Sequence, residues 1–135
     1  MELQVGVKAL LKNSEGKYLV VRRSPEKYPE VVDQWDIVGG RINPGTSLLE
    51  NLKREIMEEV GLTLAEEPRL IAAQDILRIA DRHVVRLTYI ARINGQVKLD
   101  EDHSEYRWVT IDELRAIESI DRYLKELLTR AIITQ

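Results

Sequence analysis

The most constraining feature of this 135-residue chain is the segment from residue 39 to residue 62, GGRINPGTSLLENLKREIMEEVGL. Two glycines and a turn lead into a stretch of helical periodicity. Because successive helical residues turn by about 100°, Glu55, Glu58 and Glu59 fall within a sector of roughly 100°. An apolar stripe recurs at helical spacing on another side, formed by Leu49, Leu52, Ile56 and Val60. The segment predicts a helix that packs on a core and presents three carboxylates elsewhere.

The ends of this helix also have sequence signals. Ser47 followed by Glu50 predicts a capping box, and Gly61 predicts the end of the helix. Glu50, Arg54 and Glu58 lie four residues apart, which favours ion pairs along the surface. One interpretation of the acidic face is therefore a solvated helix with surface salt bridges. The other is a cation site, since crowded carboxylates repel one another and Mg²⁺ prefers carboxylate oxygens.

The same segment resembles the Nudix box, G-x5-E-x7-R-E-U-x-E-E-x-G-U, where U is aliphatic. Counted from Gly40, eight of the nine specified positions match, and Thr46 replaces the first glutamate. The other matching residues are Arg54, Glu55, Ile56, Glu58, Glu59, Gly61 and Leu62. The first strands resemble the MutT-like branch of this superfamily. The threonine can cap or hold water, but it cannot supply negative charge.

The resemblance implies an α/β protein with the Nudix fold, an α/β/α sandwich around a central mixed β-sheet. It implies a single domain over residues 1–135 with its box at 40–62. The implied activity is Mg²⁺-dependent hydrolysis of the phosphoanhydride bond in a nucleoside diphosphate linked to another group, with Mn²⁺ as the alternative ion. The MutT-like start favours a nucleoside triphosphate, which would give a nucleoside monophosphate and pyrophosphate.

Two other functions stay open. One is hydrolysis of ADP-ribose or another nucleoside-diphosphate sugar, although the proline that this branch carries well downstream of the box has no counterpart, since Pro68 is too close. The other is a non-catalytic nucleotide-binding module, because of Thr46.

By the same resemblance, the metal-ligand candidates are the carbonyl of Gly40 and the side chains of Glu55, Glu58 and Glu59. Arg54 is expected to orient Glu55 or Glu58, because a guanidinium can hold a carboxylate by two hydrogen bonds. Glu59 is the first choice for the metal ligand that matters most for catalysis.

A second acidic cluster occupies residues 101–105, just before the YRWV sequence. In MutT-like proteins an acidic residue of this loop reaches the metal site as a ligand or general base. Glu105 is the first candidate and Glu101 the second, and His103 could transfer a proton near neutral pH. The alternative is that the loop is simply solvated.

The substrate-binding candidates lie before the box. Arg23 resembles the phosphate-contacting arginine of MutT-like triphosphatases, and strand alternation turns Arg22 to the opposite face. The alternative is that both arginines are a solvated strand end. Tyr28 and Trp35 could stack on a base, although Trp35 fits the core equally well. Trp108 is expected in the core.

The pattern outside the box predicts alternating strands and helices. Residues 3–12 and 17–23 read as a hairpin, 24–34 as a loop and 35–38 as a short strand. Strands are also predicted at 69–79, 83–93 and 106–109. Thr110 and Glu113 predict a capping box, and helical spacing from about Ile120 through Leu124 to Ile132 predicts a final helix.

The composition restricts the expected cellular location and the expected binding partners. The net charge is −3, which disfavours binding to a nucleic-acid polymer, so the expected partner is a small nucleotide. The chain has no cysteine, no apolar run long enough for a membrane and no secretory signal pattern, and we expect it to be cytoplasmic. A homodimer is an expectation from the family resemblance.

Overall fold

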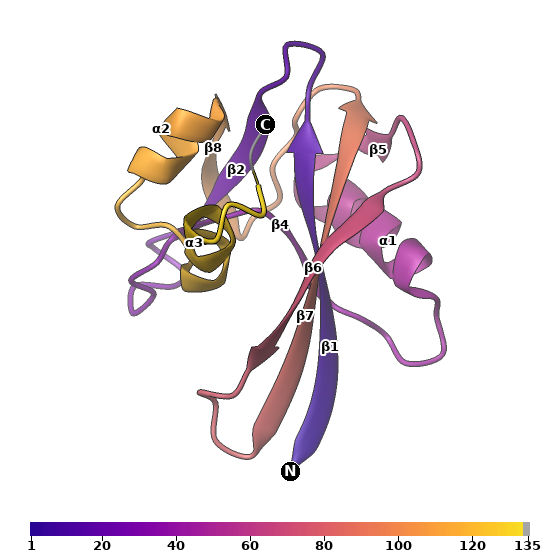
Figure 1. Ribbon diagram of the computed structural model, residues 1–135, viewed down its shortest axis with the longest axis vertical. Helices are drawn as coiled ribbons and strands as arrows, with labels where there is room; N and C mark the ends of the chain where they lie inside the picture. The colour runs from indigo at the N-terminus through magenta and orange to yellow at the C-terminus, as the bar shows by residue number, and fades with distance from the viewer. Residues whose placement is uncertain (134–135) are drawn as a thin grey trace.

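A computed structural model describes residues 1–133 (Figure 1). In chain order the strands are β1 (Glu2–Lys12), β2 (Tyr18–Arg23), β3 (Trp35–Asp36), β4 (Val38–Arg41), β5 (Thr63–Leu64), β6 (Arg69–Ile76), β7 (Arg82–Asn94) and β8 (His103–Val109). The helices are α1 (Leu48–Val60), α2 (Ile111–Ala116) and α3 (Arg122–Thr129). Within residues 1–133, no helix is long and apolar enough to cross a membrane.

Strand β1 lies at the centre of a mixed sheet. It pairs in parallel with β7 from Glu2 to Lys12, and on its other edge it pairs antiparallel with β4. Strand β6 continues the sheet beyond β7 in antiparallel orientation. Strand β2 pairs with both β3 and β8, also antiparallel. The predicted mixed sheet is therefore confirmed.

The predicted hairpin of residues 3–12 and 17–23 is only partly correct. The turn forms, with the side chain of Asn13 accepting from the amides of Glu15 and Lys17. The paired register of β1 and β2, however, consists of Lys12 opposite Tyr18. The same edge of β1 is used by β4, and β2 turns away to pair with β8.

Two apolar cores cover the two faces of the sheet and make the α/β/α sandwich (Figure 1). On one face, Val7, Ala9 and Leu11 of β1 pack with Leu52, Ile56 and Val60 of α1. On the other, Leu10 of β1 packs in a core that includes Leu114 of α2 and Leu124 and Leu127 of α3. Strands buried on both faces lose the simple alternation of apolar and polar residues. Strand β1 accordingly contributes apolar side chains to both cores.

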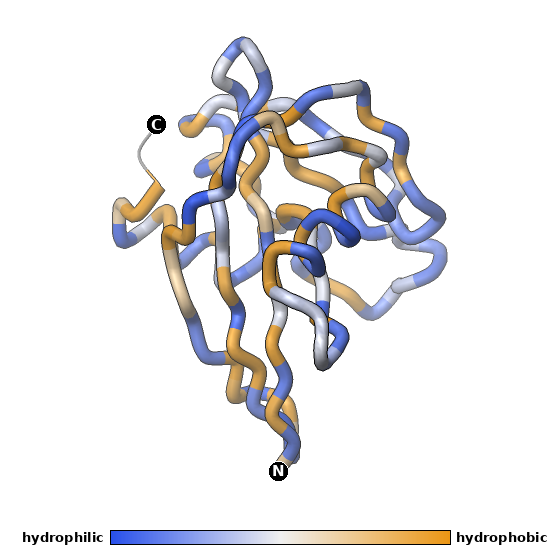
Figure 2. Tube along the Cα trace, turned by 90° about the vertical axis from the view of Figure 1, so that its right-hand side faces the viewer, coloured by the Kyte–Doolittle hydropathy of each residue, from blue (hydrophilic) through white to orange (hydrophobic). Residues whose placement is uncertain are grey.

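Away from these cores, the end of the sheet near the N-terminus extends beyond the helices. In Figure 2 its strands alternate between hydrophilic and hydrophobic residues. Leu3 is accordingly 67% exposed.

Helix α2 begins as predicted, whereas α3 begins slightly later and ends earlier than predicted. Thr110 and Glu113 form the predicted capping box of α2. The carboxylate of Asp121 caps α3 by accepting from two amides, which places the first helical residue at Arg122. The helix ends at Thr129 because Ala131 adopts a left-handed conformation with a φ of 56°. The helical spacing that extends to Ile132 therefore continues beyond the helix itself.

Candidate functional site

The glycine turn packs directly against its neighbours. Gly39 has a φ of 140°, and a Cβ there would lie 2.0 Å from the carbonyl oxygen of Val7. Only glycine fits such a position. At Gly40 a Cβ would lie 2.7 Å from Oε2 of Glu55. The turn therefore brings the backbone of β4 into contact with the acidic face of α1.

Helix α1 ends at Gly61 as predicted, but only the Ser47 half of the predicted capping box forms at its start. The Ser47 hydroxyl accepts from the amide of Glu50, and Gly61 has the left-handed conformation with a φ of 66°. Glu50 is exposed and lies outside the cluster formed by the other glutamates. Thr46 is exposed too, and its carbonyl rather than its hydroxyl takes part in the packing of the turn.

Asn51 holds the turn onto the helix, and sequence reasoning missed it. The side chain is 0% exposed and makes four hydrogen bonds. Its amide nitrogen donates to the carbonyls of Thr46 and Ser47, and its oxygen accepts from the Asn43 amide and from the Arg54 guanidinium. This is the full hydrogen-bonding capacity of an amide side chain. The available signal was an asparagine, a poor helix former, beside the apolar stripe.

Arg54 connects this asparagine to the glutamates. Its Nη2 lies 2.9 Å from Oδ1 of Asn51, and its Nη1 lies 2.9 Å from Oε1 of Glu55 and 3.4 Å from Oε2 of Glu58. The arginine thus contacts both candidate carboxylates, but by one hydrogen bond to each rather than by the expected two to one of them. The side chain of Glu55 is 14% exposed whereas that of Glu58 is 59% exposed, so Glu58 lies at the rim.

Glu59 is the buried member of the acidic face. One of its oxygens accepts from the Gly39 amide at 2.9 Å. Burial raises the pKa of Glu59 to about 8, and the adjacent carboxylate of Glu55 adds to the rise, against the opposing effects of Lys8 and the Gly39 amide. Too little positive charge surrounds Glu55 and Glu59 for both carboxylates to be ionised at neutral pH. A bound cation would supply the missing positive charge.

This pKa predicts that the metal-free protein becomes less stable as pH rises. A carboxyl group with a folded pKa of about 8 and an ordinary value of 4.5 holds its proton more tightly in the folded state. Between those values the unfolded state binds fewer protons, so the free energy of unfolding falls by roughly 1 to 4 kcal/mol as pH increases. Urea unfolding in a chelator between about pH 5 and pH 8 measures this. A Glu59→Gln variant should show a smaller slope, and an equal slope would contradict the assignment.

The segment before the last strand differs from the prediction. Residues 103–105 belong to β8, and Glu105 lies opposite Arg22, which donates to it at 2.7 Å. This pair lies on the face of β2 opposite to Arg23, so Glu105 does not reach the glutamates of α1. Glu101 is 94% exposed beside Lys27. Neither acidic candidate reaches the site.

His103 does reach it. Its Nε2 lies 3.6 Å from Oε1 of Glu59, and its Nδ1 lies 2.7 Å from Oδ1 of Asp100. The strand register shifts between Arg22 and Arg23, so that His103 lies opposite Arg23 on the side of α1. A β-bulge of this kind redirects a side chain.

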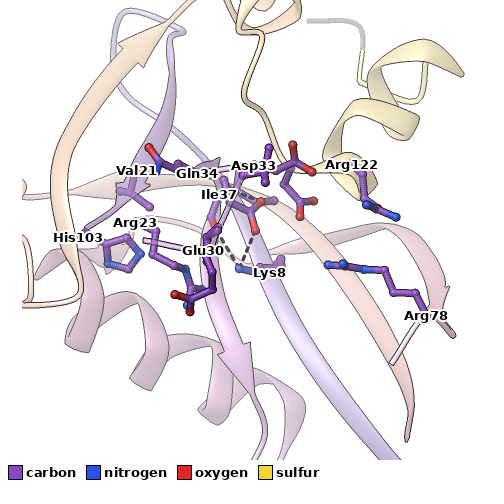
Figure 3. Close-up of a pocket in the computed structure, with 14 residues that line it drawn as sticks. Lys8, Val21, Arg23, Glu30, Asp33, Gln34, Ile37, Arg78, His103 and Arg122 are labelled. Carbon is purple, nitrogen blue, oxygen red and sulfur yellow. Dashed lines mark hydrogen bonds and ion pairs between the residues drawn. The ribbon is translucent and has the colours of Figure 1, made fainter. Parts of the chain in front are cut away.

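A groove runs from this site across the sheet (Figure 3). It consists of two hollows of about 400 and 360 Å³ that share Lys8, Arg23, Arg78 and Asp121 in their walls. The second hollow also reaches Gly39, Gly40, Arg41 and Arg86. Figure 3 shows Lys8 in the middle, His103 and Arg23 on one side, and Arg78 and Arg122 on the other. The groove thus combines a glycine turn with several cationic side chains, and its first hollow is also lined by the acidic residues Glu30, Asp33 and Asp36.

Some of these charges are paired beneath the groove. Arg86, 4% exposed, lies 3.2 Å from both Asp36 and Asp121, and Lys8 lies 3.1 Å from Asp36. Burial raises the pKa of Asp36, but Arg86 and Lys8 outweigh this and lower it to about 2. These pairs anchor β1, β3, β7 and the start of α3 to one another.

The two aromatic candidates lie outside the groove walls. Trp35 is 5% exposed in the core, with the Arg107 guanidinium 4.6 Å from its ring, so stacking on a base is excluded. Tyr28 lies under Arg23, whose guanidinium is 4.9 Å from the ring centre. Arg23 itself lines both hollows, as its predicted role requires. Trp108 packs against the core on the side of α1.

Within residues 1–133, no group of three or more acidic or histidine side chains is arranged closely enough to hold a metal ion. Two carboxylates do fit one, since Glu55 and Glu59 lie together beside the glycine turn and share a deficit of positive charge. Mg²⁺ commonly uses one or two protein carboxylates and takes its other ligands from water and substrate phosphates. Glu58, held by Arg54, would need to turn to join them.

A mixed sheet between helical layers, with a glycine turn and a glutamate-bearing helix opening into a cationic groove, has the architecture of enzymes that hydrolyse phosphoanhydrides. The NUDIX domain model matches residues 2–130, and the chain belongs to this family of hydrolases. Nudix hydrolases generally use divalent metal ions.

Individual relatives agree with this family. The nucleoside triphosphatase NudI of Escherichia coli O17:K52:H18 is 30% identical over 113 residues, which cover 75% of this chain and 78% of the relative. The crystal structure of the MutT protein from Methanosarcina mazei Go1 has a TM-score of 0.80 and 28% identity, over 96% of this chain and 92% of that one. The MutT Nudix hydrolase structure from Burkholderia pseudomallei, at 24% identity and a TM-score of 0.76 over 96% and 98% of the two chains, supports the fold.

Proposed function

We propose that this protein is a Mg²⁺-dependent pyrophosphohydrolase that converts a nucleoside triphosphate to a nucleoside monophosphate and pyrophosphate. One observation carries the proposal. The glycine turn that contacts Glu55 and Glu59 also forms part of a groove lined by Lys8, Arg23 and Arg78. A chain of net charge −3 needs such a local reversal of sign to admit a polyphosphate. The NudI relative, a nucleoside triphosphatase, supports this substrate class.

In the proposed reaction, water adds to phosphorus and the bond to the bridging anhydride oxygen breaks, so that pyrophosphate leaves. A divalent ion would shield the phosphate oxygens and favour deprotonation of the water. Glu55 and Glu59 would hold that ion together with the carbonyl of Gly40, and Glu58 would join from the rim. Arg54 fixes Glu55, and Arg23 and Arg78 would bind phosphate oxygens in the groove.

The environment of Thr46 supports a catalytic role over a binding-only module. The position that lacks the family glutamate is exposed, and Arg54 has the buried Asn51 as a partner. The Glu55 and Glu59 pair is thus assembled without a carboxylate at position 46.

A substrate panel tests the proposal. Nucleoside triphosphates and ADP-ribose are incubated with Mg²⁺, with Mn²⁺ or with a chelator, and pyrophosphate and orthophosphate are measured separately. We expect pyrophosphate and a monophosphate from triphosphates, and a loss of at least about a hundredfold in the chelator. Faster cleavage of ADP-ribose would favour the sugar-nucleotide alternative. Nucleotide-dependent thermal shifts without any product would favour a binding module.

A further inference from the structure

The segment that carries His103 is tied to the C-terminal end of α1. The Lys98 amide donates to the carbonyl of Val60 at 2.8 Å, and the Asp100 amide donates to the carbonyl of Glu59 at 3.0 Å. These backbone hydrogen bonds place the side chains of Asp100, His103 and Glu59 in a row. The His103 side chain is 9% exposed and also lines the groove.

Asp100 determines which ring nitrogen faces the glutamate. Its Oδ1 lies 2.7 Å from Nδ1 of His103, and a carboxylate only accepts, so Nδ1 carries the hydrogen. In neutral imidazole the lone pair then resides on Nε2, on the side of Glu59. A histidine held at one nitrogen by a carboxylate and free to coordinate at the other is a recurrent arrangement in metal sites.

The distance to Glu59 is slightly longer than shared coordination requires, so the two side chains would draw together by a few tenths of an ångström when an ion binds. Nε2 of His103 and Oε1 of Glu59 are 3.6 Å apart, beyond hydrogen-bond length. Two ligands each about 2.1 Å from one ion are separated by roughly 3.0 to 3.4 Å for bond angles between 90° and tetrahedral. The other oxygen of Glu59 is held by the Gly39 amide, so Oε1 is the available donor.

We propose that Nε2 of His103 is a nitrogen ligand of the divalent ion bound by Glu59. This inference rests on the proposed function, because it concerns the same ion. It adds a nitrogen to a set of oxygen donors, and imidazole suits first-row transition ions better than Mg²⁺. The site should therefore bind Mn²⁺ more tightly than Mg²⁺.

Pulsed electron paramagnetic resonance of bound Mn²⁺ tests the proposal directly in the unaltered chain. We expect modulation from a coordinated nitrogen that changes when the protein is made with ¹⁵N-labelled histidine. The chain has two histidines, and His83 provides the control because it also pairs with an aspartate, Asp75, at 2.7 Å. We expect His83→Asn to keep the nitrogen signal and His103→Asn to lose it.

The asparagine in the second variant can still donate to Asp100, but it places no atom at the position of Nε2. Mn²⁺ binding measured by titration should weaken by about tenfold or more in His103→Asn, with little change for Mg²⁺. Tight Mn²⁺ binding without a histidine nitrogen signal would overturn this inference and leave the proposed function intact. If Mn²⁺ and Mg²⁺ fail to bind at all, both the inference and the proposed metal site are wrong.

Discussion

Glu59→Gln is expected to lower the turnover of the best substrate by roughly a hundred- to a thousandfold while the protein stays folded. Glutamine retains the shape of the side chain and can still accept from the Gly39 amide, which glutamate does at 2.9 Å. It cannot supply the negative charge that a divalent ion requires. Because burial opposes ionisation of Glu59, the neutral amide should leave stability unchanged or raise it at neutral pH.

Glu50→Gln is the matched control. Glu50 lies in the first turn of the same helix, is exposed, and lies away from the buried pair. Steady-state rates and thermal unfolding of the two variants show whether activity depends on a negative charge at the site or on any negative charge of this helix. Full activity in folded Glu59→Gln would mean that the proposed metal ligands are wrong.

Gly39→Ala is expected to have the largest effect on stability. The new Cβ would overlap the backbone of β1, 2.0 Å from the Val7 oxygen, and the residue would keep an unfavourable φ of 140°. Strand β1 is paired on both edges here and cannot move aside. We expect a loss of about 4 kcal/mol or more in the free energy of unfolding, measured in urea, or failure to fold.

Substitutions at two other glycines distinguish the cost of an unfavourable φ from the cost of steric overlap. Gly45 has a φ of 89° but open space around a Cβ, so Gly45→Ala should cost only about 1 kcal/mol, from the backbone alone. At Gly40 the Cβ would meet the flexible end of Glu55, at 2.7 Å. Gly40→Ala should therefore fold and lose on the order of a hundredfold in turnover, because the carboxylate is displaced. Similar stability of all three variants would contradict this account of the turn.

The loop and helix of residues 39–62 could be predicted from the sequence because their signals are local. The cap at Ser47, the stop at Gly61 and the grouping of Glu55 with Glu59 depend on helical geometry alone. The contact of Arg54 with Glu58 follows from the i,i+4 spacing, whereas its contact with the adjacent Glu55 does not.

The acidic residue of the last loop could not be chosen in this way. Strand alternation places His103 and Glu105 on one face, but a register shift in β8 separates them. One extra residue in a strand reverses every side chain beyond it, and pairing with a distant strand determines where that residue lies. The resemblance to MutT-like proteins favoured the acidic Glu105, whereas the tertiary structure brings His103 to Glu59.

By itself, then, the sequence determined the acidic helix, its ends and the glycine turn, since each depends on residues a few positions apart. Only the tertiary structure decided that Trp35 is core, that Asn51 holds Arg54, and that β1 pairs with β7. It also decided that Lys8, Arg23 and Arg78 line one groove, whose glycine turn contacts Glu55 and Glu59. These contacts join residues far apart in the chain, and packing of both sheet faces, rather than local propensity, selects them.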